Sequence, residues 1–206
     1  MRPAWIDTDM GFDDLAAVLM IAASPDLSIA GLSLVAGNAP LEVVADNAGR
    51  AAALFGWNIP IHRGRDRPIL RTLVTAEQVL GAGAMSTAGR TLPKRVARLS
   101  PMDAISALIA ELVRSQNALT ILALGPLTNL AVALLVRPDL VSRIERVVWM
   151  GGSVGPRQPY CGRGIQRCGR PRGGTDRSEC RRAVQDDRAR CLSPGSGNRR
   201  RRRHAA

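Results

Sequence analysis

Four aspartates lie within eight residues near the start of the chain, in the segment Asp7-Thr8-Asp9-Met10-Gly11-Phe12-Asp13-Asp14. Carboxylates this close repel one another, and the arrangement is costly unless a cation or good hydrogen bonds compensate. Hard divalent cations such as Ca²⁺ and Mg²⁺ take oxygen ligands of this kind. The alternative is structural, because acids near a helix N-terminus interact favourably with the helix dipole. That alternative accounts for any single aspartate here, but not for an acid pair at a strand end as well.

The apolar pattern around these acids predicts the elements that position them. A buried strand is expected at 3–7 and a helix at 12–23, while residues 63–100 are expected to be mostly loop. Further along the chain we predict strands at 27–36, 59–61, 119–124 and 144–150, and helices at 40–55, from 103 onward and from 129 to 135. Near-continuously apolar strands that alternate with helices are typical of an α/β fold, a mostly parallel open sheet with helices on both faces.

Other polar groups follow the predicted strands. Asn38 follows the second strand, the segment 125–129 follows the strand that ends at Leu124, and Met150 ends the last strand. In open parallel sheets, ligands bind beyond the carboxyl ends of the strands. Each position also has an ordinary interpretation, since an asparagine after glycine often forms a turn and a methionine is often a core residue.

The motifs in this order resemble those of the inosine–uridine nucleoside hydrolase family. The acidic segment resembles the family's D-x-D-P-G-x-D-D signature, and the other motifs are Val35-Ala36-Gly37-Asn38, Leu124-Gly125-Pro126-Leu127-Thr128-Asn129 and Met150-Gly151-Gly152. The resemblance covers residues 3–155. Two departures stand out: Met10 replaces the usual proline, and the base-contacting loop near 78–90 has no histidine.

The resemblance implies a mechanism by position. Asp9 and Asp14, together with the backbone carbonyl of Leu124, would ligate Ca²⁺. Asp7 would support the metal site, either as a further ligand or through contact with the ligands. Asp9 would also be the catalytic base for a calcium-bound water that attacks the anomeric carbon and releases free base and ribose. Substrate contacts would come from Asp13, Asn38 and Met150. The resemblance further implies a small nucleoside substrate and a homo-oligomer.

The last part of the chain differs sharply from the rest. Residues 1–155 hold 14 basic against 13 acidic residues and no cysteine, whereas 156–206 hold 15 arginines against 4 acids and all 4 cysteines. A segment so poor in apolar periodicity is expected to be disordered. We therefore predict a partial hydrolase-like domain over 1–155 and a disordered basic tail over 156–206. A shift of reading frame near 155–157 is our hypothesis for this change, and it predicts impaired activity.

Two other functions remain open from the sequence. Arg-rich runs bind phosphates by charge, so a non-catalytic fragment that binds nucleic acid non-specifically through its tail is the main alternative. A phosphatase of the haloacid-dehalogenase type would use Asp7 and Asp9, but it leaves Asp13, Asp14 and Asn38 unexplained. The sequence begins without a signal-peptide pattern, and its apolar runs are too short to cross a membrane. We expect a soluble cytoplasmic protein.

Overall fold

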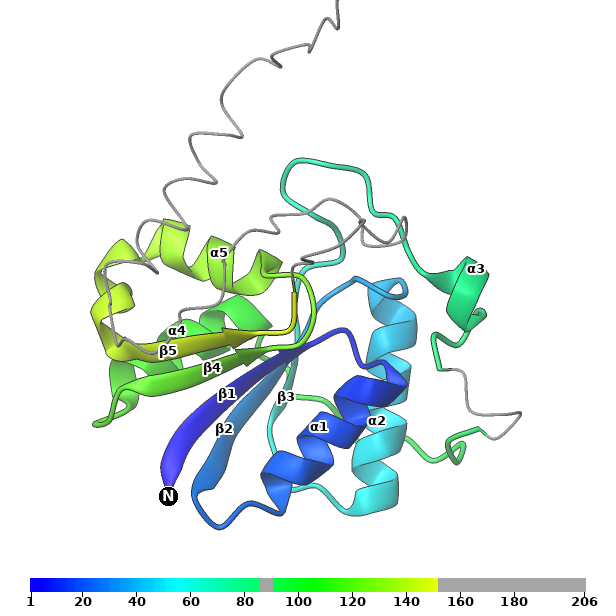
Figure 1. Ribbon diagram of the computed structural model, residues 1–206, viewed down its shortest axis with the longest axis horizontal. Coiled ribbons are helices and arrows are strands. Elements are labelled where there is room, and N and C mark those ends of the chain that lie inside the picture. The colour runs from blue at the N-terminus through cyan, green and yellow to red at the C-terminus, as the bar shows by residue number, and fades with distance from the viewer. Residues whose placement is uncertain (86–90, 152–206) are drawn as a thin grey trace, which may run out of the picture.

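The computed structural model describes residues 1–85 and 91–151 (Figure 1). The predicted tail over 156–206 therefore lies outside the described residues, as do the last residues of the predicted domain. The elements are β1 Arg2–Thr8, α1 Phe12–Ala22, β2 Leu27–Leu34, α2 Leu41–Phe55, β3 Ile61–Arg63, α3 Glu77–Leu80, α4 Ala104–Arg114, β4 Leu119–Ala123, α5 Thr128–Val136, the 3-10 helix η1 Pro138–Arg143 and β5 Ile144–Trp149.

The strands form a five-stranded sheet in the order β3-β2-β1-β4-β5, and every neighbouring pair is parallel. The chain therefore moves from β1 outward to β3, returns to β4 on the other side of β1, and continues to β5. This reversal leaves a switch point between β1 and β4, where ligands commonly bind in open α/β sheets. The predicted fold class is confirmed.

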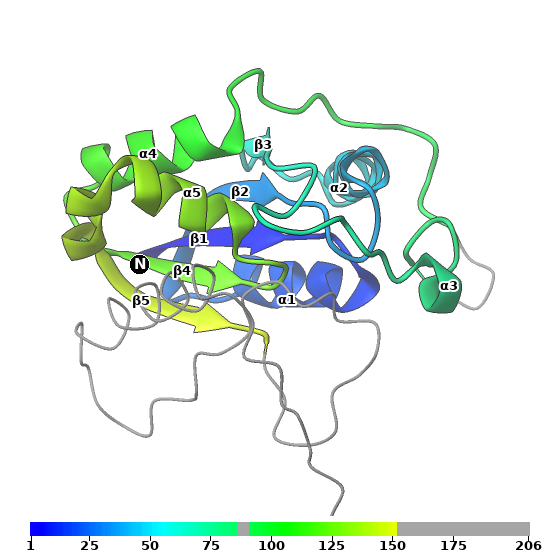
Figure 2. The same cartoon turned by 90° about the horizontal axis from the view of Figure 1, so that it is seen from above.

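Helices cover the two faces of the sheet and create two apolar cores. Adjacent strand residues point to opposite faces, so Ile6 packs with α1 and α2 while Trp5 packs with α4 and α5. Figure 2 shows α4 and α5 on one side of the strands and α1 on the other. Both residues are fully or almost fully buried. β1 is the central strand, with β2 on one side and β4 on the other, and this packing on both faces fixes the position of the acids at its end.

The structure departs from the predicted elements in two places. The third strand begins at Ile61 instead of residue 59, because Pro60 has no N–H to donate to a strand ladder. The 3-10 helix η1 was not predicted, since a six-residue segment is too short to show helical periodicity. The long segment before α4 is mostly loop, as predicted, with the single short helix α3.

None of the helices within the described ranges is both long and apolar enough to cross a bilayer.

Candidate functional site

The loops after β1, β2 and β4 meet closely around Asp9, at the switch point of the sheet. A Cβ added to Gly37 would lie 2.1 Å from Asp9 Oδ2, and one added to Gly125 would lie 3.0 Å from the Asp9 backbone nitrogen. A side chain at either glycine would therefore collide with the acidic loop or press against it. Because Gly37 and Gly125 have no side chains, the backbones of the loops after β2 and β4 can lie directly against Asp9.

Asp7 is the one acid on β1. It is buried, and only one of its two carboxylate oxygens is hydrogen-bonded. Its Oδ1 accepts hydrogen bonds from the Ser33 hydroxyl and from Asn129 Nδ2, the latter at 2.8 Å. Its Oδ2 is buried without a hydrogen-bond partner. Burial raises the pKa of Asp7 to about 6, against the opposing effect of these two hydrogen bonds. One oxygen of Asp7 is therefore fixed in place and the other is left free inside the protein.

Asp9 lies in the next turn of the same loop and is also buried, with 5% of its surface exposed. Its Oδ2 accepts a hydrogen bond from the Asn38 backbone N–H at 2.7 Å, which ties the acidic loop to the loop after β2. Burial, followed by repulsion from Asp14, raises the pKa of Asp9 well above its ordinary value. A carboxyl group with a raised pKa that is also held in position is suited to accept and release a proton.

Asp14 has both a capping role and an unexplained oxygen. Its Oδ2 accepts hydrogen bonds from the Thr8 hydroxyl at 2.8 Å and from the Gly11 N–H at 3.1 Å, so it caps the start of α1. The structural alternative is therefore correct for this oxygen. Its Oδ1 is buried and accepts no hydrogen bond, while the Asp9 carboxyl lies beside the Asp14 side chain. Burial raises the pKa of Asp14. Capping does not explain why the whole side chain is buried, since helix caps function well in contact with water.

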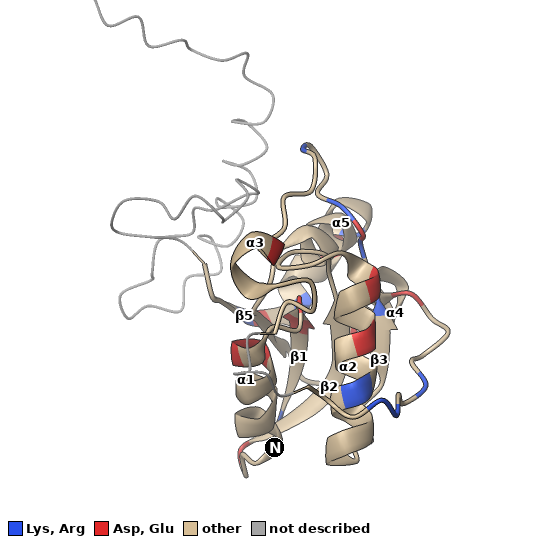
Figure 3. Cartoon of the chain, turned by 90° about the vertical axis from the view of Figure 1, so that its right-hand side faces the viewer, with Lys and Arg blue, Asp and Glu red and all other residues tan. Residues whose placement is uncertain are grey.

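Asp13 and Asn38 come together above Gly11. A Cβ built on Gly11 would lie 2.9 Å from Asp13 Oδ1 and 3.1 Å from Asn38 Nδ2. Asp13 is exposed and Asn38 is partly exposed, so both side chains can reach a molecule in solvent. Figure 3 shows acidic residues at one end of α1. The two residues predicted to hold a sugar thus lie side by side next to the buried carboxylates.

Leu124 and Met150 lie at the ends of β4 and β5. The Leu124 N–H donates to the Asp7 carbonyl at 2.7 Å, which places Leu124 directly beside the acidic loop. The Met150 N–H donates to the Ala123 carbonyl at 2.9 Å, and its side chain is half exposed. Leu124 is therefore close to the predicted metal ligands, whereas Met150 is one strand further away at the sheet edge.

The residues present meet part of the requirement for a bound cation. Within 1–85 and 91–151, no three Asp, Glu, His or Cys side chains gather closely enough to enclose an ion by themselves. Two buried carboxylate oxygens nevertheless have no partner, Asp7 Oδ2 and Asp14 Oδ1. Unpaired buried carboxylate oxygens are expensive, and hard oxygen donors are what Ca²⁺ prefers. The donor chemistry fits calcium, and the ligand set within the described part of the chain is partial.

Three polar residues of the site were not predicted as functional. Thr8, Ser33 and Asn129 are fully or nearly fully buried and donate hydrogen bonds to Asp14 or Asp7. Asn129 lies within a motif that the sequence already singled out, so its position at the start of a helix after a strand was an available signal. Ser33 gave no signal, because a serine inside an apolar strand looks like an ordinary small residue.

Met10 adopts a backbone conformation that the family's usual proline would not allow. Its φ is 45°, and its side chain is completely buried. Its N–H donates to the Thr8 hydroxyl at 2.9 Å. Proline fixes φ near −65° and has no N–H, so this loop depends on a residue other than proline at position 10.

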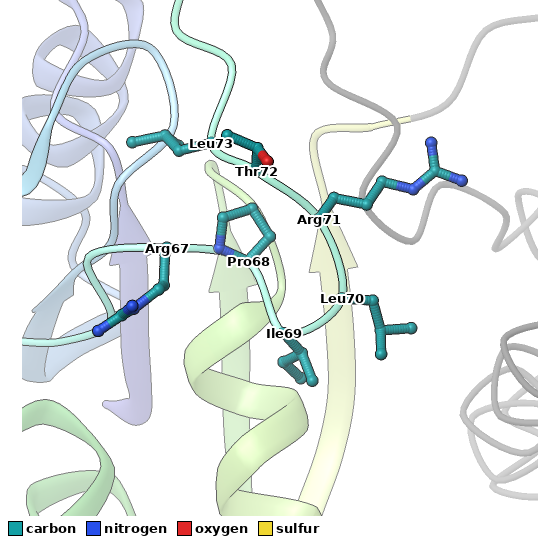
Figure 4. Close-up of a pocket in the computed structure, with 7 residues that line it drawn as sticks. All are labelled: Arg67, Pro68, Ile69, Leu70, Arg71, Thr72 and Leu73. Atoms are coloured by element: carbon teal, nitrogen blue, oxygen red, sulfur yellow. The ribbon is translucent and has the colours of Figure 1, made fainter.

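A separate open hollow lies along the loop between β3 and α3. It has a volume of about 530 Å³ and is lined by seven consecutive residues, Arg67 to Leu73 (Figure 4). None of the predicted site residues lines it, and it contains no carboxylate. The acidic loop holds the buried carboxyl groups whose pKa values are raised, and such groups mark reactive sites.

Comparison with known proteins agrees with this geometry. Residues 4–176 match the profile of the inosine-uridine preferring nucleoside hydrolases, which extends past the end at residue 155 that the motifs indicated. The chain belongs to this family, whose members are N-glycosyl hydrolases. A pyrimidine-specific ribonucleoside hydrolase, RihA of Photobacterium profundum, is 35% identical over 153 residues, which cover 74% of this chain and 49% of the relative.

Solved structures give the same result. An inosine-guanosine nucleoside hydrolase superposes with a TM-score of 0.67 at 29% identity, covering 75% of this chain and 50% of the other. A plant nucleoside hydrolase, PpNRh1, gives a TM-score of 0.67 at 30% identity, covering 74% and 48%. The chain therefore spans about half the length of the relatives it matches.

Proposed function

We propose that this protein hydrolyses the N-glycosidic bond of ribonucleosides, with Ca²⁺ as its cofactor. The observation that carries the proposal is the pair of unpartnered carboxylate oxygens, Asp7 Oδ2 and Asp14 Oδ1, buried at the switch point of a nucleoside hydrolase fold. Burial of unpaired carboxylates lowers stability, so their presence is best explained by a cation that they bind.

The ion would be held by the side chains of Asp7, Asp9 and Asp14 and by the backbone carbonyl of Leu124. When bound, Ca²⁺ lowers the pKa of water in contact with it and orients sugar hydroxyls. Asp9 accepts the proton of the attacking water, a role that its position and raised pKa support. The new bond forms between the water oxygen and the anomeric carbon while the bond to the base nitrogen breaks. The electron pair of the broken bond stays on the base nitrogen, which takes up a proton from solvent, and Asp9 then returns its proton to solvent. The transition state is expected to be oxocarbenium-like, as in other glycoside hydrolysis.

Asp13 and Asn38 are proposed to bind ribose hydroxyls. Their side chains converge over Gly11, are accessible to solvent, and offer a carboxylate acceptor and an amide donor to a diol. Met150 is proposed to contact the sugar from the end of β5, where its half-exposed side chain is available.

The proposed substrate class is ribonucleosides in general. The relatives of this chain are named for different substrates: one is a pyrimidine-specific ribonucleoside hydrolase and another is an inosine-guanosine nucleoside hydrolase. We propose reduced activity for this chain, because the ligand set within its described part is partial. A cytoplasmic location and a homo-oligomer remain part of the proposal. Nucleic-acid binding by 156–206 stays a prediction about residues outside the described ones.

The test is base release from inosine and uridine, followed chromatographically with the full 206-residue chain in Ca²⁺ and in EDTA. We expect calcium-dependent release that is slower than that of RihA, and no release by Asp9→Ala. A matched control is Asp46→Ala, which removes a partly exposed aspartate of α2 that pairs with Arg50. Release that persists in EDTA or in Asp9→Ala would contradict the mechanism, and no release from the calcium-loaded chain would contradict catalysis.

A further inference from the structure

Two buried polar residues, Ser33 and Asn129, hold Asp7 through the same oxygen. Asn129 Nδ2 donates to Asp7 Oδ1 at 2.8 Å, and the Ser33 hydroxyl donates to that oxygen as well. Both residues are completely buried. Since an ionised carboxylate has two equivalent oxygens, two donors on one of them leave the other one free and fix its direction.

Both donors are themselves held firmly from behind. Ser33 Oγ accepts a hydrogen bond from Trp5 Nε1 at 2.9 Å, so the single hydroxyl proton points away from Trp5. Of its two possible acceptors, Asp7 Oδ1 is closer than the Ile6 carbonyl, which lies 3.4 Å away. Asn129 Oδ1 accepts from the Arg65 N–H at 2.8 Å, and its Nδ2 also donates to the Leu34 carbonyl at 3.0 Å. The bond from Arg65 fixes which end of the amide is oxygen, so the NH₂ group must face Asp7.

Asn129 also lies directly against the backbone of Gly64. A Cβ added to Gly64 would lie 2.3 Å from Asn129 Oδ1 and 2.5 Å from its Nδ2. The side chain therefore fills the space left by a glycine and links the ends of β1, β2 and β3 from the first turn of α5. A side chain fixed by three segments is a rigid support for the group it contacts.

The geometry points to Ser33 and Asn129 as positioning residues that present Asp7 Oδ2 to a divalent cation. They bind Oδ1 and leave Oδ2 as the one oxygen of Asp7 that is buried without a partner. This inference rests on the proposed calcium site and adds two residues to it. Partners of this kind orient metal ligands, and their loss typically weakens metal affinity by about 10-fold to 100-fold.

The test is the calcium dissociation constant of the full chain, measured by titration calorimetry after removal of metal with a chelator. Ser33→Ala and Asn129→Leu each remove one donor to Asp7, and we expect affinity to fall about 10-fold or more in each. Ser33→Thr keeps the hydroxyl and is expected to retain affinity. Asn47→Leu is the matched control, because Asn47 is another buried asparagine, whose Nδ2 donates to the Gly83 carbonyl instead.

Leu112→Ala separates positioning from stability. It removes a completely buried side chain of α4 from the core in which Trp5 packs, but it leaves both donors to Asp7 and their own partners in place, so the melting temperature should fall while calcium affinity is retained. Unchanged affinity in folded Ser33→Ala would overturn the inference even if Asn129→Leu failed to fold. Equal losses of affinity in Leu112→Ala and Ser33→Ala would also overturn it, in favour of a purely structural role. No binding by the wild-type chain would instead refute the calcium site itself, and this inference with it.

Discussion

Two aspartates at helix starts, Asp14 on α1 and Asp103 before α4, show opposite behaviour. Asp103 Oδ1 accepts hydrogen bonds from the N–H groups of Ile105 and Ser106 at 3.0 Å each, and its contacts with Ser106 lower its pKa. Asp14 caps α1 through Thr8 and Gly11, yet it is completely buried and its pKa is raised by that burial. The same residue type in a similar local role is stabilising in one place and costly in the other.

The difference shows which acids need an explanation beyond the fold. A solvent-exposed cap stabilises its helix and leaves no oxygen buried without a partner. Asp7 and Asp14 each have a buried oxygen with no hydrogen-bond partner, and Asp9 has its pKa raised well above normal. Buried charges of this kind reduce stability unless they are compensated, and groups with such shifts cluster at functional sites.

The largest expected effect is on the free energy of unfolding of the calcium-free protein, which should depend on pH. The pKa of Asp7 is about 6 in the folded protein against 3.8 when unperturbed. A raised carboxyl pKa contributes stability that is complete below pH 3.8 and is lost as pH rises through 6. Asp7 alone should then cost about 2 kcal/mol between pH 4 and 7, out of about 3 kcal/mol for the whole shift. Denaturant unfolding in EDTA at several pH values measures this loss.

Asp103 supplies the internal control for that experiment, because its lowered pKa acts in the opposite direction. Its stabilisation is present above its unfolded pKa and is lost only as pH falls below about 4. Added Ca²⁺ should restore stability at pH 7, since a ligand that binds only the folded state stabilises it. Stability in EDTA that rises steadily from pH 4 to 7 would contradict the description of Asp7.

Gly37→Ala is the next largest change. The new Cβ would lie 2.1 Å from Asp9 Oδ2 and 2.8 Å from Pro126 Cδ, so one of the loops must move. Overpacking of this sort costs about 1–3 kcal/mol. Gly83→Ala is the matched control, because nothing lies within 4 Å of its added Cβ. Chemical denaturation compares the two, and equal effects would show that the loops around Asp9 are not closely packed.

The smallest effect is expected from the exposed cap. Asp103→Ala removes the acceptor for two N–H groups of α4 and should destabilise the protein by about 1 kcal/mol. Calcium affinity should not change, since Asp103 is exposed and accepts hydrogen bonds only from the first turn of α4. Unfolding curves and calcium titrations on the same preparation check both statements, and a weakened calcium site would remove the contrast with Asp14.

Much of the fold followed from the sequence because its signals are local. Apolar runs predicted four of the five strands near their observed positions, and the helix predicted from residue 103 onward begins at Ala104. The acidic segment and the glycines were recognised from residue type and spacing. The third strand was placed two residues early, since Pro60 affects pairing with β2 and a single segment does not show its partner.

The detailed chemistry of the site could not be predicted, because it depends on contacts between distant segments. Asp7 and Asn129 are 122 positions apart, and their bond exists only because α5 begins where β1 ends in space. Which oxygen of Asp7 is free depends on Ser33, through the pairing of β1 with β2. Sequence spacing identifies the acids, but it does not show which of their atoms remain without partners.

The central claim is that the acidic loop binds a divalent cation, and calcium titration calorimetry on the full chain tests it most directly. We predict a single-site isotherm for the wild-type protein and no binding by Asp14→Asn. This substitution removes the negative charge and turns one carboxylate oxygen into an NH₂ group, while the shape of the side chain is kept. Asp103→Asn should bind as the wild type does. No heat from the wild-type chain, or an unchanged isotherm in Asp14→Asn, would contradict the account.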